Sequence, residues 1–220
     1  MINKASIRTK YKHVSIFFVI FYMIGAIGLI VPFSYPLFVK LTFWALLLSN
    51  VGLFIFHESY RPKQEFLFFA GLFLTGFIIE AVGVNTGIIF GEYHYGDALG
   101  LILFNTPLLI GLNWLFLSYS SVSISESLFA ETKLQLLISP TILLIFDVVL
   151  EQLAPQMNMW NWANSSVPVK NYIAWWVIGF VFTGMFKLFK INTHNPLALV
   201  LFLSQFLFFT VLFIAYNIFI

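Results

Sequence analysis

The strongest constraint on this fold is a series of seven long apolar runs, separated by short segments that carry most of the charges. A helix needs about 20 apolar residues to cross the hydrocarbon core of a membrane, and the runs have about this length. They lack the alternation typical of barrel strands, and backbone in lipid must satisfy its own hydrogen bonds. The sequence therefore predicts an all-α fold, a polytopic membrane helical bundle of about seven transmembrane helices, at residues 14–31, 37–56, 66–84, 100–120, 134–153, 171–189 and 197–220.

The composition agrees with this prediction and excludes several classes of protein. Only 9% of the 220 residues are charged and 60% are hydrophobic. In a soluble domain roughly a quarter of all residues are charged. A net charge of +2 gives no basic footprint for nucleic acid, so none is expected as a partner. The absence of cysteine excludes disulfides and cysteine-ligated metals. With no linker or repeat, residues 1–220 are predicted to form a single integral-membrane domain.

Proline positions support these boundaries. Six of the eight prolines fall in the gaps between spans, where turn residues are expected. The other two, Pro107 and Pro140, lie inside spans and predict kinks or local breaks, which membrane helices tolerate.

Lysine and arginine are unevenly divided between the two sets of loops, and their count sets membrane orientation. If the N-terminus is inside, nine of them lie in inner segments and only Lys40 and Lys170 lie in outer segments. The sequence therefore predicts a multi-pass protein of the cell (inner) membrane, surrounded by membrane lipid. Its N-terminus is expected in the cytoplasm and its C-terminus outside.

In this orientation the polar residues of the spans collect near the outer face. Glu80 lies near the outer end of span 66–84, and Asp147 and Glu151 lie near the outer end of span 134–153. The outer loop contains the motif GEYHYGD after the apolar residues 86–90, which predicts a loop that folds back toward the membrane as a lid. Three residues of this motif are candidates for binding a substrate: Tyr93, His94 and Tyr95.

The three carboxylates are the candidate catalytic residues. A charged side chain at mid-membrane costs about 3 kcal/mol even on a lenient scale, so these groups are expected to face a cavity or a partner. Asp147 and Glu151 are four residues apart and share a helix face. Two ionised acids there would repel each other, and a carboxylic acid kept neutral is what general-acid catalysis requires. The sequence leaves open that they only form hydrogen bonds between helices.

Aromatic and amide residues near the same face are further candidates for substrate binding. Aromatic faces can stabilise a cation formed during a reaction, although an interfacial belt of tryptophan is the alternative explanation. The candidates are Asn105, Trp160, Trp162, Asn171 and Trp175.

Several chemistries have no support in the sequence. Membrane di-iron enzymes need closely spaced histidines, but the four here lie at positions 13, 57, 94 and 194. Only His94 is expected on the outer side, so no metal site is predicted. A retinal protein needs a lysine in its last span, and residues 197–220 contain none.

Two blocks of residues resemble the integral-membrane carotenoid hydratases, a family that includes the γ-carotene 1′,2′-hydratases and the bisanhydrobacterioruberin hydratases. The first block is Glu80-x-x-Gly83-x-x-Thr86-Gly87-x-x-Phe90-Gly91-x-Tyr93-x-Tyr95, followed by Pro107 and Trp114. The second is Asp147-x-x-x-Glu151, Trp160-x-Trp162 and Pro168-x-x-Asn171-x-x-x-Trp175. Together they cover about residues 66–180.

The resemblance implies that water is added across the terminal C1=C2 bond of an acyclic carotenoid of the lycopene or γ-carotene type, with no redox cofactor. An acid protonates C2, aromatic faces shield the cation at C1, and water captures it. Asp147 is the expected proton donor and Glu80 the group that handles water, although these roles could be exchanged. An end-group cyclase and a non-catalytic carotenoid- or lipid-binding membrane protein remain the alternatives.

Overall fold

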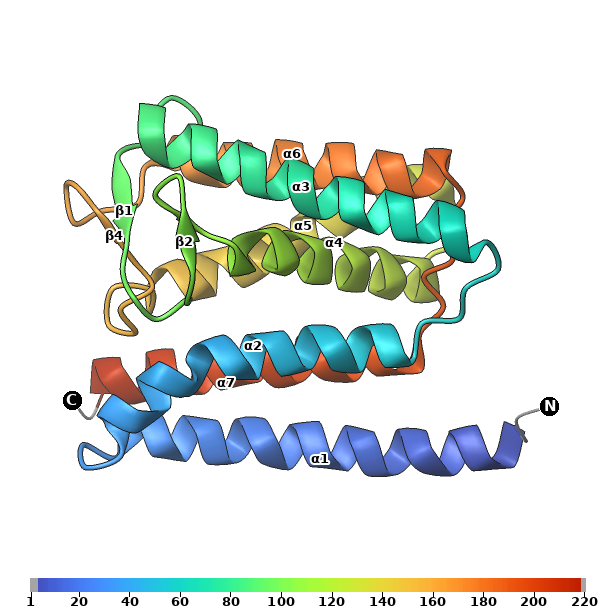
Figure 1. The fold of residues 1–220 in the computed structure, drawn as a ribbon, viewed down its shortest axis with the longest axis horizontal. Coiled ribbons are helices and arrows are strands. Elements are labelled where there is room, and N and C mark those ends of the chain that lie inside the picture. The colour runs from blue at the N-terminus through green and yellow to red at the C-terminus, as the bar shows by residue number, and fades with distance from the viewer. Residues whose placement is uncertain (1–3, 219–220) are drawn as a thin grey trace.

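The computed structural model describes residues 4–218, and for residues 4–9 it describes the backbone alone. This part of the chain forms seven α-helices and four short strands (Figure 1). The prediction of an all-α membrane bundle is confirmed. Residues 219 and 220 of the last predicted span lie outside the described residues. The helices are α1 (Lys4–Ile30), α2 (Tyr35–Ile55), α3 (Pro62–Thr86), α4 (Leu109–Leu128), α5 (Thr132–Glu151), α6 (Val169–Leu188) and α7 (Pro196–Ile218).

Six of the helices, all except α4, are long and apolar enough to cross a membrane. Their bounds lie close to the predicted spans, except that α1 begins ahead of its span, at Lys4. Proline accounts for several of the starts. Pro36, Pro62 and Pro196 lie in the first turns of α2, α3 and α7, where a missing N–H loses no helical hydrogen bond.

The fourth predicted span differs most from the structure. It was expected at residues 100–120, but α4 begins at Leu109 and ends at Leu128. Residues 102–107 instead form a hairpin of β2 (Ile102–Leu103) and β3 (Thr106–Pro107). The prediction that Pro107 lies inside a span and kinks or breaks it is therefore wrong, because this residue precedes the helix. Pro140 does lie inside α5, which continues through it to Glu151 without a break.

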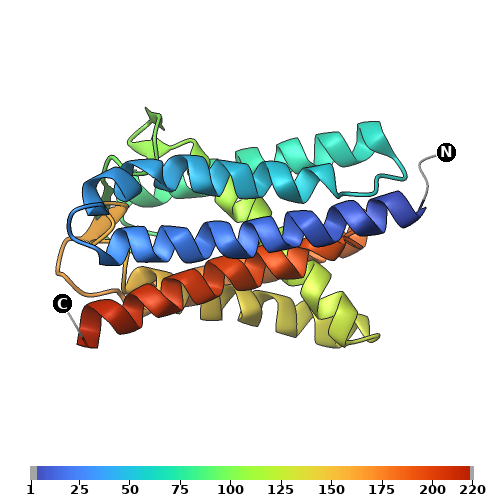
Figure 2. The same ribbon diagram turned by 90° about the horizontal axis from the view of Figure 1, so that it is seen from below.

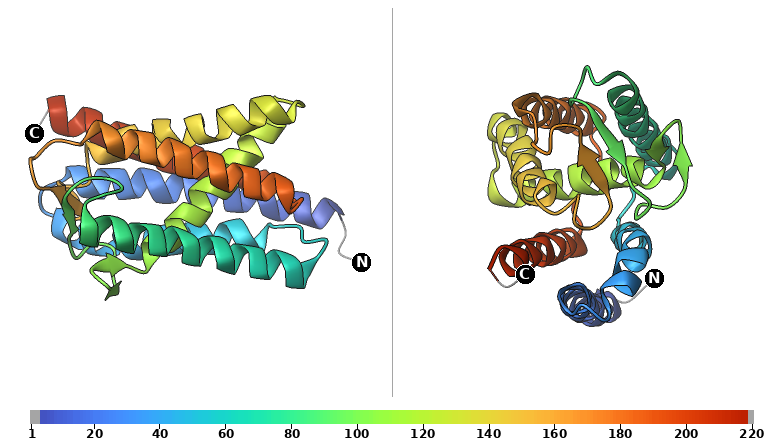
Figure 3. Two further views of the ribbon diagram at one scale, coloured as in Figure 1. Left: turned by 90° about the horizontal axis from the view of Figure 1, so that it is seen from above. Right: turned by 90° about the vertical axis from the view of Figure 1, so that its left-hand side faces the viewer.

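The helix α4 lies in the middle of the bundle, in contact with α2, α3, α5, α6 and α7 (Figure 3). Most of its residues are buried, including Ser118, Ser120, Ser121 and Ser125. Because the surrounding helices shield α4 from lipid, its serines do not have to face hydrocarbon. One of them pairs with α5, where Ser121 Oγ lies 3.0 Å from Ser139 Oγ. Its central position explains why α4 can be less apolar than a lipid-facing span requires.

The helices fall into two groups. The helices α3, α4, α5 and α6 lie together, while α1 packs against α2 and α7 on the other side of the bundle (Figures 1 and 2). The start of α1 lies at one end of the bundle, and the end of α7 lies at the opposite end (Figure 1). The loops 87–108 and 152–168 both lie at the end where α7 finishes, so they can build a common site.

These two loops are joined by a short antiparallel ladder. β1 (Tyr93–Tyr95) pairs with β4 (Trp160–Trp162). α3 ends at Thr86 and is followed by Gly87, whose φ of +65° is in the left-handed region that favours glycine, and the chain turns back there over the bundle. At Gly96 a Cβ atom would lie 2.3 Å from the carbonyl oxygen of Asn158, so the loops can approach only because no side chain is present. The loop that was expected to fold back contributes β1 to this ladder. The β1–β4 ladder covers one end of the bundle and is here called the cap.

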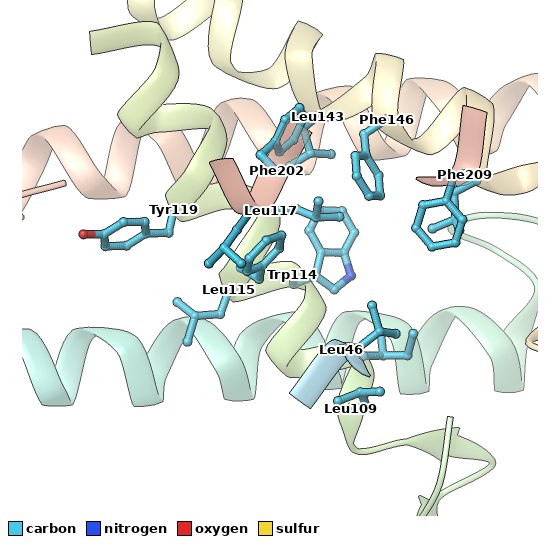
Figure 4. Close-up of a cluster of buried hydrophobic side chains, with 14 of the residues drawn as sticks. Leu46, Leu109, Trp114, Leu115, Leu117, Tyr119, Leu143, Phe146, Phe202 and Phe209 are labelled. Carbon is cyan, nitrogen blue, oxygen red and sulfur yellow. The ribbon is translucent and has the colours of Figure 1, made fainter. Parts of the chain in front are cut away.

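The core continues from the helices to a position beneath this cap. Figure 4 shows Trp114 of α4 with Leu46, Phe146 and Phe209 near its ring, and these side chains come from α2, α5 and α7. All four are buried. The polar residues described next therefore lie at the boundary between an apolar core and the cap.

Candidate active site

Glu80 lies near the end of α3 and is 4% exposed. Its Oε2 accepts hydrogen bonds from the hydroxyls of Tyr93 and Tyr95, both at 2.7 Å. Its Oε1 accepts one from Trp114 Nε1 at 2.9 Å. One turn before it, a Cβ on Gly76 would lie 2.7 Å from Trp114 Cβ, so this glycine lets α4 approach closely. Glu80 is thus held by donors from the cap and from the central helix.

The two tyrosines of β1 lie outside the membrane-spanning helices and remain donors. Burial raises the pKa of the Tyr93 and Tyr95 hydroxyls above the ordinary tyrosine value, and the nearby Glu80 carboxylate raises both further. A raised pKa means that the neutral hydroxyl persists at pH values where an exposed tyrosine ionises. Both O–H groups therefore stay available to Glu80 as the pH rises.

The second acidic group is a pair on α5. Asp147 and Glu151 are one turn apart and buried, 0% and 4% exposed. A single amide joins them: Asn171 Nδ2 donates to Asp147 Oδ2 at 3.2 Å and to Glu151 Oε1 at 3.1 Å. Asn171 lies in the first turn of α6, which packs along α5. The amide uses both of its hydrogens to hold the two acids together.

Two tryptophans of β4 complete the surroundings of Glu151. Trp160 Nε1 and Trp162 Nε1 donate to Glu151 Oε2 at 3.0 and 2.7 Å. The tryptophan ring nitrogen and the asparagine amide nitrogen can only donate. In all three of these hydrogen bonds the Glu151 oxygen is therefore the acceptor. Asp147 differs, because its Oδ1 is buried and has no hydrogen-bond partner in the described part of the chain. This oxygen can carry a proton, and so can Glu151 Oε1, which accepts one hydrogen bond, from Asn171.

The register of the β1–β4 ladder explains why these aromatic residues point the same way. Tyr93 lies opposite Trp162, and Tyr95 lies opposite Trp160. Alternate residues of a strand point to the same face, so all four side chains face the bundle. Their rings are in contact, with centroids 5.0 Å apart for Tyr93–Trp162 and 6.2 Å for Tyr95–Trp160.

These groups surround one pocket, here called the carboxylate pocket. Its walls include both Glu80 and Glu151, and Trp114 and Trp175 stack there with ring centroids 4.2 Å apart. Its free volume is about 40 Å³, which is room for roughly three water molecules. Apolar side chains such as Leu46, Phe146 and Phe209 form part of its wall. The pocket therefore combines acids, water-sized space, aromatic faces and an apolar wall.

The structure brings most of the predicted site residues together. Eight of them line the carboxylate pocket: Glu80, Tyr93, Tyr95, Glu151, Trp160, Trp162, Asn171 and Trp175. Asp147 is not among the lining residues and lies behind the wall, connected to the pocket through Asn171.

Two predicted residues lie elsewhere. His94 is exposed, because it alternates with Tyr93 and Tyr95 and shares the outer face of the ladder with Asn161. Asn105 is exposed at the tip of the β2–β3 hairpin, where Phe104 and Asn105 have φ of 52° and 60°. Two positive φ values are typical of a type I′ turn, in which asparagine is favoured. Asn105 Nδ2 donates to Asn85 Oδ1 at 2.8 Å and so ties the hairpin to α3.

Three pocket residues with polar side-chain groups were not among the predicted site residues. Trp114 belongs to the first motif block but was given no role, and it is the donor to Glu80. Asn113 and Gln205 also line the pocket. Gln205 is buried and interrupts the very apolar helix α7, and a buried polar group inside an apolar span is a signal for function. Gln205 could therefore have been found from the sequence, but a neutral amide in an apolar span is a weaker indication of function than a carboxylate.

The charge balance of the pocket favours acid chemistry. Its lining residues include two glutamates and no lysine or arginine. Burying several ionised acids without a cation is costly, so the arrangement favours a neutral acid beside an anion. Within residues 4–218, no group of three or more histidine, aspartate or glutamate side chains is placed to hold a metal ion.

Comparison with known proteins gives a match to one family model. Residues 40–220 match the family described as carotenoid biosynthesis protein, and this range includes every residue that lines the carboxylate pocket. Neither the curated proteins nor the solved structures gave a match.

Proposed function

Because this chain belongs to the carotenoid biosynthesis protein family, we propose that it is a carotenoid 1,2-hydratase, a hydro-lyase of the membrane. It adds water across the terminal C1=C2 bond of an acyclic carotenoid end group. The observation that carries this proposal is that acids from two separate helices, Glu80 and Glu151, line one small pocket with stacked tryptophans. Alkene hydration needs a proton donor, a shielded cation and water, and this pocket has a group for each.

In the first step the Asp147–Glu151 pair supplies the proton. The π electrons of the alkene take a proton from the pair through Glu151, the member that lines the pocket. A new C2–H bond forms, a tertiary cation is left at C1, and the carboxylic acid becomes a carboxylate. Asp147 shares the Asn171 amide with Glu151, and because two neighbouring carboxylates repel each other, it helps to keep one acid of the pair protonated.

In the second step water captures the cation. The faces of Trp114 and Trp175 stabilise the positive charge, and Glu80 accepts a proton from the water as its oxygen bonds to C1. The three donors to Glu80 hold its oxygens in place for this task. Return of that proton to the α5 pair through solvent restores the enzyme, so the net reaction consumes only the carotenoid and one water.

The experiment that tests the proposal is expression in a lycopene-producing bacterium, with mass analysis of the extracted pigments. We expect a more polar product that is heavier than the substrate by one water for each reacting end. An isomer of unchanged mass would instead identify an end-group cyclase. Unaltered pigment in cells that contain well-inserted protein would refute catalysis on this substrate.

Acid variants connect that product to the pocket. General-acid or general-base groups contribute about 10²–10⁴ in rate, so Glu151→Gln and Glu80→Gln are each expected to reduce product formation at least about 100-fold. Glu58→Gln is the matched control, because Glu58 is exposed at the opposite end of the bundle. Equal activity of all three variants would remove the carboxylates from the mechanism.

A further inference from the structure

A second cavity lies between α1, α2 and α7, away from the capped acids. Its walls include Phe21, Tyr22 and Gly25 of α1, Leu41 and Ala45 of α2, and Phe208 of α7. Its free volume is about 120 Å³, three times that of the carboxylate pocket. We call it the apolar cavity.

The lining of the apolar cavity offers no free polar group. Its polar side chains are Tyr22 and Thr42. The Tyr22 hydroxyl lies 2.6 Å from Ser49 Oγ, and the Thr42 hydroxyl donates to the carbonyl oxygen of Phe38. Since both hydroxyls already have partners, the cavity suits a hydrocarbon and gives a polar ligand nothing to bind.

The apolar cavity adjoins the carboxylate pocket. Leu46 of α2 and Phe209 of α7 line both spaces, and Figure 4 shows these two side chains near Trp114. The two spaces are therefore neighbours, and a hydrocarbon that extends from beside Trp114 into the second space would contact these two apolar side chains. Leu46 and Phe209 are the residues common to the two linings, and both are apolar.

The apolar cavity also reaches the outer surface of the bundle. Two of its lining residues, Ile24 of α1 and Leu41 of α2, are 54% and 41% exposed. Both helices are candidate membrane spans, so this surface faces the hydrocarbon of the bilayer. A substrate dissolved in the membrane can enter there without crossing water.

From these observations we propose that the apolar cavity binds the polyene chain of the substrate, next to the end group in the carboxylate pocket, and that substrate enters between α1 and α2. This inference rests on the proposed function for the identity of the ligand. The carotenoid chain is a long hydrocarbon without polar atoms, which is what the two adjoining linings accommodate. The cavity then acts as the part of the site that selects long substrates.

The test fills the cavity from α2. Ala45→Trp places a large ring in the cavity, while Leu48→Trp places the same ring on the same helix at a lipid-facing residue that lines neither space. We expect Ala45→Trp to reduce hydration of lycopene at least tenfold and to leave hydration of a short acyclic terpene with the same end group within twofold of wild type. Leu48→Trp is expected to match wild type on both. Loss on both substrates, or on neither, would overturn the inference.

A binding measurement separates this inference from the proposed function. Glu151→Gln protein purified from lycopene-producing cells is expected to retain lycopene, and adding Ala45→Trp or the milder Ala45→Leu should lower the pigment per protein at least fivefold. If wild type retains lycopene but never adds water, the proposed function fails, while the pigment ratio still tests the cavity. Equal pigment in all these proteins would mean that the polyene chain lies elsewhere.

Discussion

At the scale of single residues, the main feature of the carboxylate pocket is the set of hydrogen-bond donors that surround Glu80 and Glu151. Glu151 accepts hydrogen bonds only from nitrogen atoms, and Glu80 accepts them from one tryptophan and two tyrosines that burial keeps protonated. Such donors fix the position of each carboxylate oxygen. Position matters because proton transfer requires the acid within hydrogen-bond reach of the reacting atom.

Trp114→Phe tests one of these donors. The change removes the N–H bond to Glu80 while keeping an aromatic ring beside Trp175. A hydrogen bond to a charged group contributes about 1.5–3 kcal/mol, so we expect the rate of product formation to fall about 10- to 100-fold. Trp176→Phe is the control, since Trp176 donates to Thr141 and does not line the pocket. Pigment conversion per inserted protein is the measurement, and equal rates would argue against a role for the Trp114 donor.

At the scale of elements, the β1–β4 ladder carries four of the pocket aromatics. The sequences Tyr-His-Tyr and Trp-Asn-Trp alternate large aromatic residues with polar ones, and the antiparallel register puts all four aromatics on the bundle side. The ladder continues at Gly96, whose N–H donates to the carbonyl oxygen of Met159 at 2.8 Å. The cap therefore depends on close backbone contact as much as on side chains.

Gly96→Ala and His94→Ala separate these two contributions. The alanine at residue 96 would meet the Asn158 backbone at 2.3 Å, and relieving such overpacking costs about 1–3 kcal/mol. We expect Gly96→Ala to lower both activity and the unfolding temperature. His94→Ala should change neither by much, because His94 is on the exposed face of the same strand. A large loss of activity in His94→Ala with normal thermal unfolding would return His94 to the site.

At the scale of the whole molecule, the bundle separates two ends of different character. The capped pocket lies at the end where α7 finishes, opposite the start of α1 (Figure 1). The distribution of lysine and arginine predicts that the capped end faces outward across the inner membrane. A carotenoid that spans the bilayer would then have one end group near the outer boundary of the membrane.

Single cysteines can test this orientation, because the natural chain has none. Glu92→Cys and Glu131→Cys place one thiol at an exposed position on each end of the bundle. In intact cells we expect a membrane-impermeant maleimide to label Glu92→Cys at once and Glu131→Cys only after permeabilisation. The reverse pattern would invert the topology and place the carboxylate pocket on the cytoplasmic side.

Much of the fold and part of the site could be predicted because they follow from local chemistry. Apolar runs of spanning length predict helices, and six of the seven spans lie close to a helix of the structure. The acids near helix ends predicted a site in the region of the carboxylate pocket, which both Glu80 and Glu151 line. The boundaries of α4 could not be predicted in this way, because its polar residues are acceptable only where five other helices surround it.

The sequence by itself therefore determined a membrane bundle and its approximate spans, since both depend on transfer from water to lipid residue by residue. Only the tertiary structure decided that Asp147 lies behind Asn171 while Glu151 lines the pocket, and that His94 faces away from it. These outcomes depend on helix packing and strand register. Both are set by contacts between residues far apart in the chain, which local patterns of apolar and polar residues do not reveal.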